Sequence, residues 1–435
     1  MRARRWLPAV GLALGAAAPA LAADDEVRFG GFAQSETAYT YSGDEHWSKF
    51  RNLLGVNAEG AFNESLSWKF SGWAYYDPVY DSSDYYPADV REDQRHEVLL
   101  RETYADLSAG DWDFRFGRQN IVWGEMVGLF FADVVSARDL REFVAQDFDR
   151  IRIPQWAARA EYFKEDMHAE FVWIPKMSYD EIGKPGDCFH CGADFYPYPP
   201  QIPGFGYRVG QESKPNGGSD DMAYGLRLSY LLNGWDVSGF YYRSMDAAPA
   251  FSRQIVLESS GPTLLYTPDH QRIQQWGTTF AKDLDGVVFR GEAIYTQGRR
   301  FDVLRLSDAD GLEAKNYLDY VLSLDYSLEN DARLNLQAFQ RYYVQYDQAM
   351  IPDRLESGVS VYYSTKAWDN RLEPEITLIH SLNRNDWMLR PRLTWNISQD
   401  LKASFGVDVF HGPPEGLFGR YTDADRVYGE LRYSF

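Results

Sequence analysis

The sequence lacks long apolar runs beyond its first residues, and it is poor in basic residues. No stretch after residue 22 has the roughly 18 consecutive apolar residues that a membrane-spanning helix requires. Acidic residues number 64 against 44 Lys and Arg, which gives a net charge of -20. Nucleic-acid binding depends on neutralising phosphates with basic groups, so this balance argues against nucleic acid as a partner.

Cysteine is almost absent, and the two that occur, Cys188 and Cys191, stand close together in the segment 176–220. In an oxidising compartment such a pair most simply forms a disulfide within one loop. A metal site would recruit His190 between them, but the spacing lacks a second pair of ligands. The sequence therefore predicts a disulfide here, and it predicts no metal or other cofactor.

The start of the chain has the pattern of a secretory signal peptide. Three arginines precede an apolar stretch over residues 7–18, and Ala20-Leu21-Ala22 supplies small residues at a cleavage site. We expect residues 1–22 to be removed on export and residues 23–435 to form a single domain.

The sequence is rich in aromatic residues and in short stretches of alternating polarity. Aromatic residues make up 16% of the chain, a composition that suits the interfacial girdles of a membrane protein. In the last fifty residues apolar side chains such as Leu393, Phe405 and Leu431 occupy every second position, and Arg390 and Arg392 lie among the polar groups between them. This period of two indicates strands with two unlike faces.

An apolar face toward lipid and a charged face toward a water-filled lumen would satisfy both sets of side chains. That alternation is typical of a transmembrane antiparallel β-barrel, which must close because an open sheet leaves backbone groups unpaired in lipid. Short turns alternate with long loops along the chain, and we count about 18 strands, within a range of about 16–20, with both chain ends on the turn side. We therefore expect an all-β fold.

Two segments interrupt this rhythm. Residues 125–154 contain Ser136-Ala137-Arg138-Asp139, which resembles a helix start and is followed by apolar residues at helical spacing. A charged helix has no place in lipid, so we expect the segment to fold into the lumen as a constriction or plug. The alternative is a helix on the surface between strand ends. Residues 176–220 are expected to form a long extracellular loop.

The inward positions of the strands provide candidates for the wall of a channel. Charges of both signs occur on the same strand, so we expect most to pair across strands and a remainder to meet a passing solute. The candidate pore-lining and constriction residues are Arg118, Glu125, Arg138, Asp139, Arg141, Arg159, Arg290, Glu292, Arg333, Arg390, Arg392 and Arg432. We expect no enzyme, because the adjacent His380 and Ser381 would point to opposite sides of a strand.

The end of the chain resembles the β-signal of Gram-negative outer-membrane proteins. Leu431, Tyr433 and Phe435 alternate with polar residues and end in a terminal Phe. By this resemblance the barrel-assembly machinery is an expected partner.

A second resemblance covers about residues 94–160. Gly117-Arg118-Gln119, then Trp123-Gly124-Glu125, then Asp139-Leu140-Arg141 are similar to a segment of the proteobacterial barrel family known as domain of unknown function 1302. The alginate-export and porin families share a looser version. The chain departs from the family in having Ser136-Ala137-Arg138 where Asn-Pro is expected before Asp-Leu.

These observations predict a channel in the outer membrane of a Gram-negative bacterium, in contact with lipid and lipopolysaccharide. We expect it to pass a small polar or amphiphilic solute without covalent chemistry. One alternative, implied by the family resemblance, is a closed barrel that accompanies an inner-membrane transporter of the resistance-nodulation type, with periplasmic or inner-membrane partners. The other is a structural or adhesive surface protein.

Overall fold

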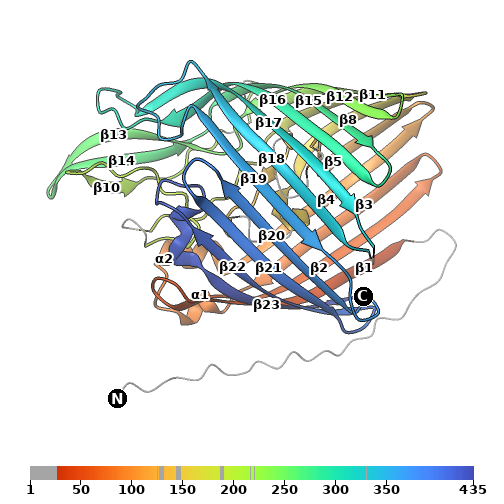
Figure 1. Cartoon of the computed structure of the whole chain (residues 1–435), viewed down its shortest axis with the longest axis horizontal. Helices are drawn as coiled ribbons and strands as arrows, with labels where there is room; N and C mark the ends of the chain where they lie inside the picture. Colours follow the sequence, from red (N-terminus) through yellow and green to blue (C-terminus); the bar gives the residue numbers. More distant parts are fainter. Residues whose placement is uncertain are drawn as a thin grey trace.

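Eighteen strands form one closed antiparallel sheet, as the alternating sequence predicts (Figure 1). The computed structural model describes residues 27–435, apart from residues 125, 127–131, 144–147, 187–190, 216, 220 and 330. The expected signal peptide therefore lies outside the described residues and remains a prediction.

The strands follow one another around the wall in chain order, and the last strand returns to the first, where Ser434 lies opposite Phe32. The barrel strands are β1 (Arg28–Thr40), β2 (His46–Asn63), β3 (Leu66–Tyr76), β4 (His96–Ala109), β5 (Trp112–Gln119), β8 (Gln155–Lys164), β9 (Met167–Lys176), β11 (Ala223–Leu232), β12 (Trp235–Met245), β15 (Arg272–Asp283), β16 (Val287–Asp302), β17 (Leu312–Ser327), β18 (Arg333–Val344), β19 (Leu355–Ser364), β20 (Leu372–Ser381), β21 (Asp386–Asn396), β22 (Leu401–His411) and β23 (Arg426–Ser434).

The two faces of the wall differ as the alternation predicts. Leu393, Phe405 and Leu431 are exposed on the outside, whereas Met388 and Asp408 are buried on the inside. The outer face is thus mainly apolar, and the charged side chains of the wall point mainly toward the barrel axis, the arrangement that lipid outside and a polar lumen require.

The two ends of the barrel differ in their connections. At one end, the turn end, consecutive strands are joined by tight connections such as Gly110-Asp111 and Asn233-Gly234. At the other end, the loop end, longer segments carry α1 (Val79–Ser82), α2 (Ala88–Gln94), the 3-10 helix η1 (Gly419–Ala424) and a small sheet of β10 (Gly206–Val209), β14 (Gly261–Asp269) and β13 (Ala250–Glu258). The β13–β14 hairpin projects beyond the barrel (Figure 1).

The segment between β5 and β8 folds into the barrel, as expected, but its expected helix is wrong. Ala137–Arg138 form a short strand, β6, which pairs with β7 (Arg152–Ile153), and only Phe148–Ile151 form a helix, α3. Phe143 has a positive φ of 52°, which an α-helix excludes. None of the helices in the described part of the chain is long and apolar enough to cross a membrane.

Aromatic rings cover glycines at five places in the wall, each ring coming from the residue directly opposite on the neighbouring strand. A Cβ atom at these glycines would come within 2.1–2.4 Å of a ring atom. The pairs are Phe32–Gly55, Phe240–Gly277, Phe280–Gly291, Phe339–Gly358 and Gly406–Tyr428. The absence of a side chain lets the ring lie flat on the neighbouring strand and shields its backbone from the lumen or from lipid.

We predict that Gly277→Val destabilises the barrel by about 1–3 kcal/mol, because the new side chain must displace the Phe240 ring. A matched control is Gly239→Val on the neighbouring strand, where the nearest atom lies 4.0 Å from the added Cβ. The free energy of unfolding in urea, measured for both variants, decides the question. Equal effects of the two substitutions would contradict the packing argument.

Candidate functional site

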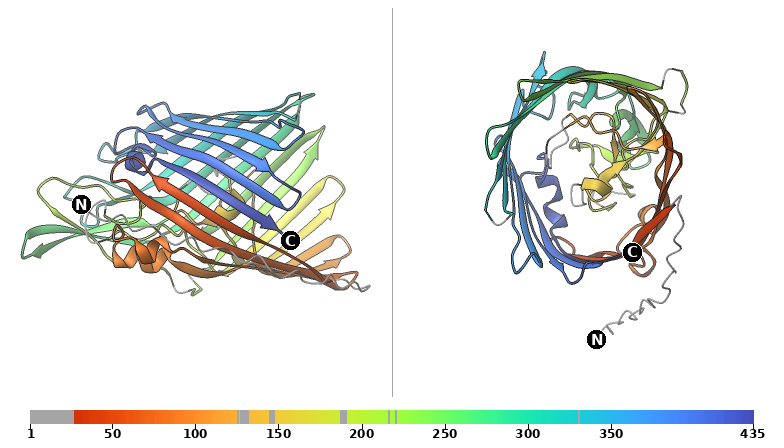
Figure 2. Two further views of the ribbon diagram at one scale, coloured as in Figure 1. Left: turned by 90° about the horizontal axis from the view of Figure 1, so that it is seen from below. Right: turned by 90° about the vertical axis from the view of Figure 1, so that its right-hand side faces the viewer.

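The candidate site is the lumen where residues 120–154, named here the inward segment, cross it. The segment leaves the wall after β5, crosses the inside of the ring of strands and rejoins the wall at β8 (Figure 2). What holds it there determines how much of the lumen stays open.

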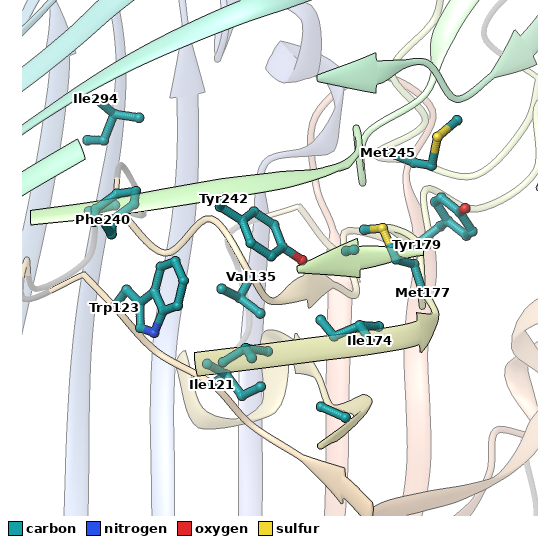
Figure 3. Close-up of a cluster of buried hydrophobic side chains, with 14 residues drawn as sticks. Ile121, Trp123, Val135, Ile174, Met177, Tyr179, Phe240, Tyr242, Met245 and Ile294 are labelled. Carbon is teal, nitrogen blue, oxygen red and sulfur yellow. The ribbon is translucent and has the colours of Figure 1, made fainter. Parts of the chain in front are cut away.

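On one side of the lumen the inward segment packs on an apolar surface of the wall. Figure 3 shows Ile121, Trp123 and Val135 facing Ile174 of β9 and Tyr242 of β12, in one buried cluster. The indole Nε1 of Trp123 donates a hydrogen bond to the carboxylate of Glu170 (3.0 Å). Burying a large apolar side chain contributes about 1.5–3 kcal/mol, so this surface fixes the beginning of the segment.

A wall carboxylate holds the next stretch. The two oxygens of Glu292 on β16 accept the backbone N–H groups of Met126 (3.1 Å) and Ala132 (2.9 Å). Glu292, predicted as a lumen residue, therefore binds the inward segment through its main chain. Hydrogen bonds to a charged acceptor are stronger than neutral ones, at about 1.5–3 kcal/mol each.

On the opposite side of the lumen, a buried set of charges, named here the charge cluster, holds the later part of the segment. Glu142 of the segment binds Lys49, Arg51 (2.9 Å) and Arg426 (3.1 Å). The charge cluster consists of Glu36, Lys49, Arg51, Glu142, Arg150, Arg390, Asp408 and Arg426, which come from β1, β2, β21, β22, β23 and the inward segment.

The second carboxylate of the cluster, Glu36, binds the other end of the segment. It forms ion pairs with Arg150 (2.5 Å) and with Lys49 (3.2 Å), and its side chain is almost completely buried. A buried ion pair loses about 3–5 kcal/mol when one partner is removed, because the other charge is left without compensation. The cluster therefore couples the position of the segment to the first and last strands of the wall.

The protonation of Glu142 fits this role. Burial would raise its pKa, but the charges of Lys49, Arg51 and Arg426 hold the pKa of Glu142 well below its ordinary value. A carboxylate with a lowered pKa keeps its contribution to stability until the pH falls through the lowered value. The ion pairs of Glu142 are thus retained over the whole neutral and mildly acidic range.

A second anchor joins the segment to the rim at the loop end. Arg141 binds Asp139 (2.6 Å) and Glu97 on β4 (2.8 Å). The backbone N–H of Arg138 donates to the carboxylate of Asp180 (2.8 Å), which belongs to the long loop after β9. Arg138, Asp139 and Arg141 were all predicted as constriction residues. They belong to the inward segment and take part in its anchor at the rim.

The remaining predicted lumen residues are mostly paired along the wall, as expected from their mixed charges. Arg390 binds Asp408 (2.7 Å), Arg392 binds Glu430 (2.9 Å) and Arg159 binds Glu161 (2.5 Å). Arg290 pairs with Asp325, and Arg432 lies over the ring of Phe32 at 3.8 Å. Three of these contacts join neighbouring strands, Arg392–Glu430 spans β22, and Arg159–Glu161 lies within β8. The availability of these charges to a solute remains a prediction.

An open cavity of about 820 Å³ lies beside this wall. It is lined by residues of β16 to β21, by Tyr428 of β23 and by residues of the nearby turns, including Arg290, Arg333, Arg390 and Arg392 together with Glu373 and Glu375. Its lining carries charges of both signs, so the space is suited to a polar solute rather than to an ion of one sign.

The remaining predicted residues lie outside the described residues or away from the main cavity. Glu125 and Cys188 lie outside the described residues, and Cys191 is disulfide-bonded. Leu431, Tyr433 and Phe435 are exposed on the outer face, and the backbone of Phe435 exchanges hydrogen bonds with Gly31 of β1 (2.9 and 3.0 Å). Arg118 lines a separate cavity near the loop end.

The sequence analysis missed the residues that matter most for the position of the segment. Glu36, Lys49, Arg51, Glu142 and Arg426 were not among its candidates. The inward direction of Glu36 can be inferred from the sequence, because Glu36 shares the parity of Phe32 and Gln34. Its pairing with Arg150, 114 residues away, and the pairing of Glu142 with Arg426, 284 residues away, give no local signal.

Comparisons with known proteins agree with this architecture. A family model described as a protein of unknown function (DUF1302) matches residues 40–435, which confirms the resemblance seen around Gly117 and Asp139. The chain is similar to OccAB1 of Acinetobacter baumannii, with a TM-score of 0.56, 9% identity and coverage of 94% of this chain and 96% of that chain. No curated protein matches the sequence.

It is also similar to OccK2 (OpdF) of Pseudomonas aeruginosa in complex with glucuronate, with a TM-score of 0.53, 10% identity and coverage of 94% of this chain and 98% of that chain. At such identities the likeness concerns the fold, which is that of an outer-membrane porin.

We predict that Asp180→Asn stabilises the protein near neutral pH. Burial raises the pKa of Asp180 to about 6, whereas an unfolded aspartate has a pKa of about 3.9. The folded state therefore disfavours the charged form, and wild-type stability falls as the pH rises from about 4 to about 6, by about 1–3 kcal/mol.

Urea unfolding of the wild type and of Asp180→Asn at pH 4 and pH 7.5 tests this. The amide of the variant keeps an oxygen that can accept the Arg138 N–H, so the substitution changes mainly the charge. Asp423→Asn, at an exposed position, is the control. A gain at Asp180 of the same size at both pH values would show that burial of the charge is not its cause.

Proposed function

We propose that this chain, which belongs to the DUF1302 family of proteins of unknown function, is a channel in the outer membrane of a Gram-negative bacterium. The solute is small and polar or amphiphilic, and it passes without covalent chemistry. One observation carries this proposal: the inward segment crosses the lumen of a closed barrel and is bound to the wall on both sides. Barrels of this size leave an aqueous channel unless something folds into them.

The lining of the lumen supports a solute with hydrogen-bonding and charged groups. The cavity beside Arg390 and Arg392 offers guanidinium groups that bind carboxylates in two-pronged geometry, and Glu373 and Glu375 accept from hydroxyl groups. The similar OccK2 structure was solved with glucuronate, a sugar with one carboxylate. A solute of that chemistry would suit the mixed charges of this lumen.

In this role the inward segment sets the size limit. Glu292 on β16 and the charge cluster on the other side fix the segment at both ends of its path. Fixing a constriction at two opposite sites keeps its width constant, which a size-selective channel requires. The alternative of a closed barrel that hands a solute to an envelope transport system draws support from the same contacts, because they hold the segment so firmly.

We predict that Glu142→Ala raises single-channel conductance in planar bilayers by about twofold or more. The substitution removes the carboxylate through which the segment binds Lys49, Arg51 and Arg426, so the segment is held less firmly at that side of the wall. Deletion of residues 126–150 is expected to give a larger increase.

The control is Glu415→Ala, which removes the same charge from an exposed position at the loop end and is expected to leave conductance unchanged. Absence of conductance in the wild type and in the deletion variant would reject the open channel and favour the closed barrel.

A further inference from the structure

The wall of the barrel is interrupted between β4 and β5. On its β3 side, β4 is paired from His96, opposite Tyr76, to Leu107. On its β5 side, pairing begins only at Thr103, opposite Arg118. Within the described part of the chain, no strand pairs with this side of β4 between His96 and Glu102.

The interruption has a clear cause in the path of the chain. β5 ends at Gln119 because the next residues turn into the lumen, where Ile121 and Trp123 are buried. A transmembrane strand needs about 9–11 residues to cross the bilayer, and β5 has 8. Because the chain turns inward after Gln119, the wall lacks a strand beside this part of β4 toward the loop end.

Exposure on the outer face marks the same place. Val98 of β4 is 84% exposed, whereas Leu54 and Leu431, which point outward from strands with neighbours on both sides, are 50% and 48% exposed. Tyr76, a residue type of the membrane interface, lies opposite His96 at the upper end of β3. The interruption therefore begins beside a residue type that is typical of the membrane interface.

A cavity of about 450 Å³ lies at the interruption and is lined from both faces of the wall. Leu99 and Arg101 line it from the lumen side, where Leu99 pairs with Trp73 and the guanidinium of Arg101 lies 4.1 Å from the Trp73 ring. Leu100 also lines it, although its side chain alternates with Leu99 and shares the outer face with Val98. The lining of the cavity thus includes residues from both faces of the wall.

The cavity combines positive charge with apolar surface. Its lining has five basic and three acidic residues, and the acids are occupied: Glu97 and Asp139 bind Arg141, and Glu181 binds Lys214. Arg118 forms no ion pair with a carboxylate of the described residues, and its buried Nε has no hydrogen-bond partner there. Leu99, Leu100, Ile153 and Met177 provide the apolar part.

We propose that this interruption is a lateral portal that binds an anionic amphiphile, with its headgroup at Arg118 and Arg101 and its alkyl chain between Leu100 and Val98 in the outer leaflet. Unpaired backbone is costly in lipid and is tolerated where it lines a polar cavity, which is what this edge of β4 does. The portal rests on the proposed channel function and defines its solute class: single-chain carboxylates that exchange between lumen and membrane. A neutral alkyl compound lacks the group that Arg118 would bind.

The test uses photo-crosslinking in proteoliposomes that contain the full-length protein. The probe is dodecanoate with a diazirine at its far end, and mass spectrometry locates the label. We expect labelling around Val98 and Leu100, competition by unlabelled dodecanoate, and little labelling with the matching dodecanol probe. Arg118→Gln is expected to reduce the labelling about tenfold, the loss of one hydrogen bond to a charged group.

Two further variants separate specific binding at this cavity from a general effect of the substitution on the protein. Arg118→Lys keeps the charge and is expected to retain most of the labelling, whereas Leu100→Trp fills the cavity and is expected to abolish it with both arginines present. Arg28→Gln, at an exposed arginine near the turn end, is the control. Labelling at Leu100 that equals labelling at Leu393 on the uninterrupted wall, or that is unaffected by Arg118→Gln, overturns the portal.

Conductance of the same wild-type preparation separates this inference from the channel proposal. Conductance without specific labelling at Leu100 rejects the portal and leaves the channel. Specific labelling without conductance rejects the channel and supports a portal on a closed barrel.

Discussion

The structure depends on one buried electrostatic arrangement, in which Glu142 is bound by Lys49, Arg51 and Arg426. Lys49 and Arg51 belong to the second strand of the wall and Arg426 to the last, so the carboxylate of an internal segment lies beside the place where the barrel closes. Three cations so near one another would repel without it. The charge cluster therefore compensates the wall and positions the inward segment at the same time, and neither function can be removed without the other.

The architecture of the wall follows from local sequence patterns. The period of two that includes Leu393, Phe405 and Leu431 indicates the face that meets lipid. Turns such as Asn233-Gly234 indicate the ends of strands. Closure follows because strands with one apolar and one charged face have no other stable arrangement in lipid. For these reasons the number of strands and their order could be predicted from the sequence.

The interior could be predicted only in outline. The charges around Ser136-Ala137-Arg138-Asp139 show that the segment cannot face lipid, but its helical spacing misleads, because β6 and β7 pair there and Phe143 has a positive φ. Tertiary contacts with Asp180 and Glu292 override the local preference. The partners of Glu142 come from both ends of the chain, Lys49 and Arg51 near its start and Arg426 near its end. The periodicity of the sequence does not predict contacts between residues so far apart.

The position of Glu36 on the first strand and of Arg426 on the last has a consequence for biogenesis. Their cluster can be completed only after the seam between these strands has formed, since before that the two halves of the binding site lie on unconnected edges. Before that stage, residues 120–154 can be held by Trp123, Glu292 and Arg141 and by the part of the cluster that lies on β1 and β2, but Arg426 cannot yet bind Glu142. Complete fixation of the segment at the charge cluster therefore requires a sealed cylinder.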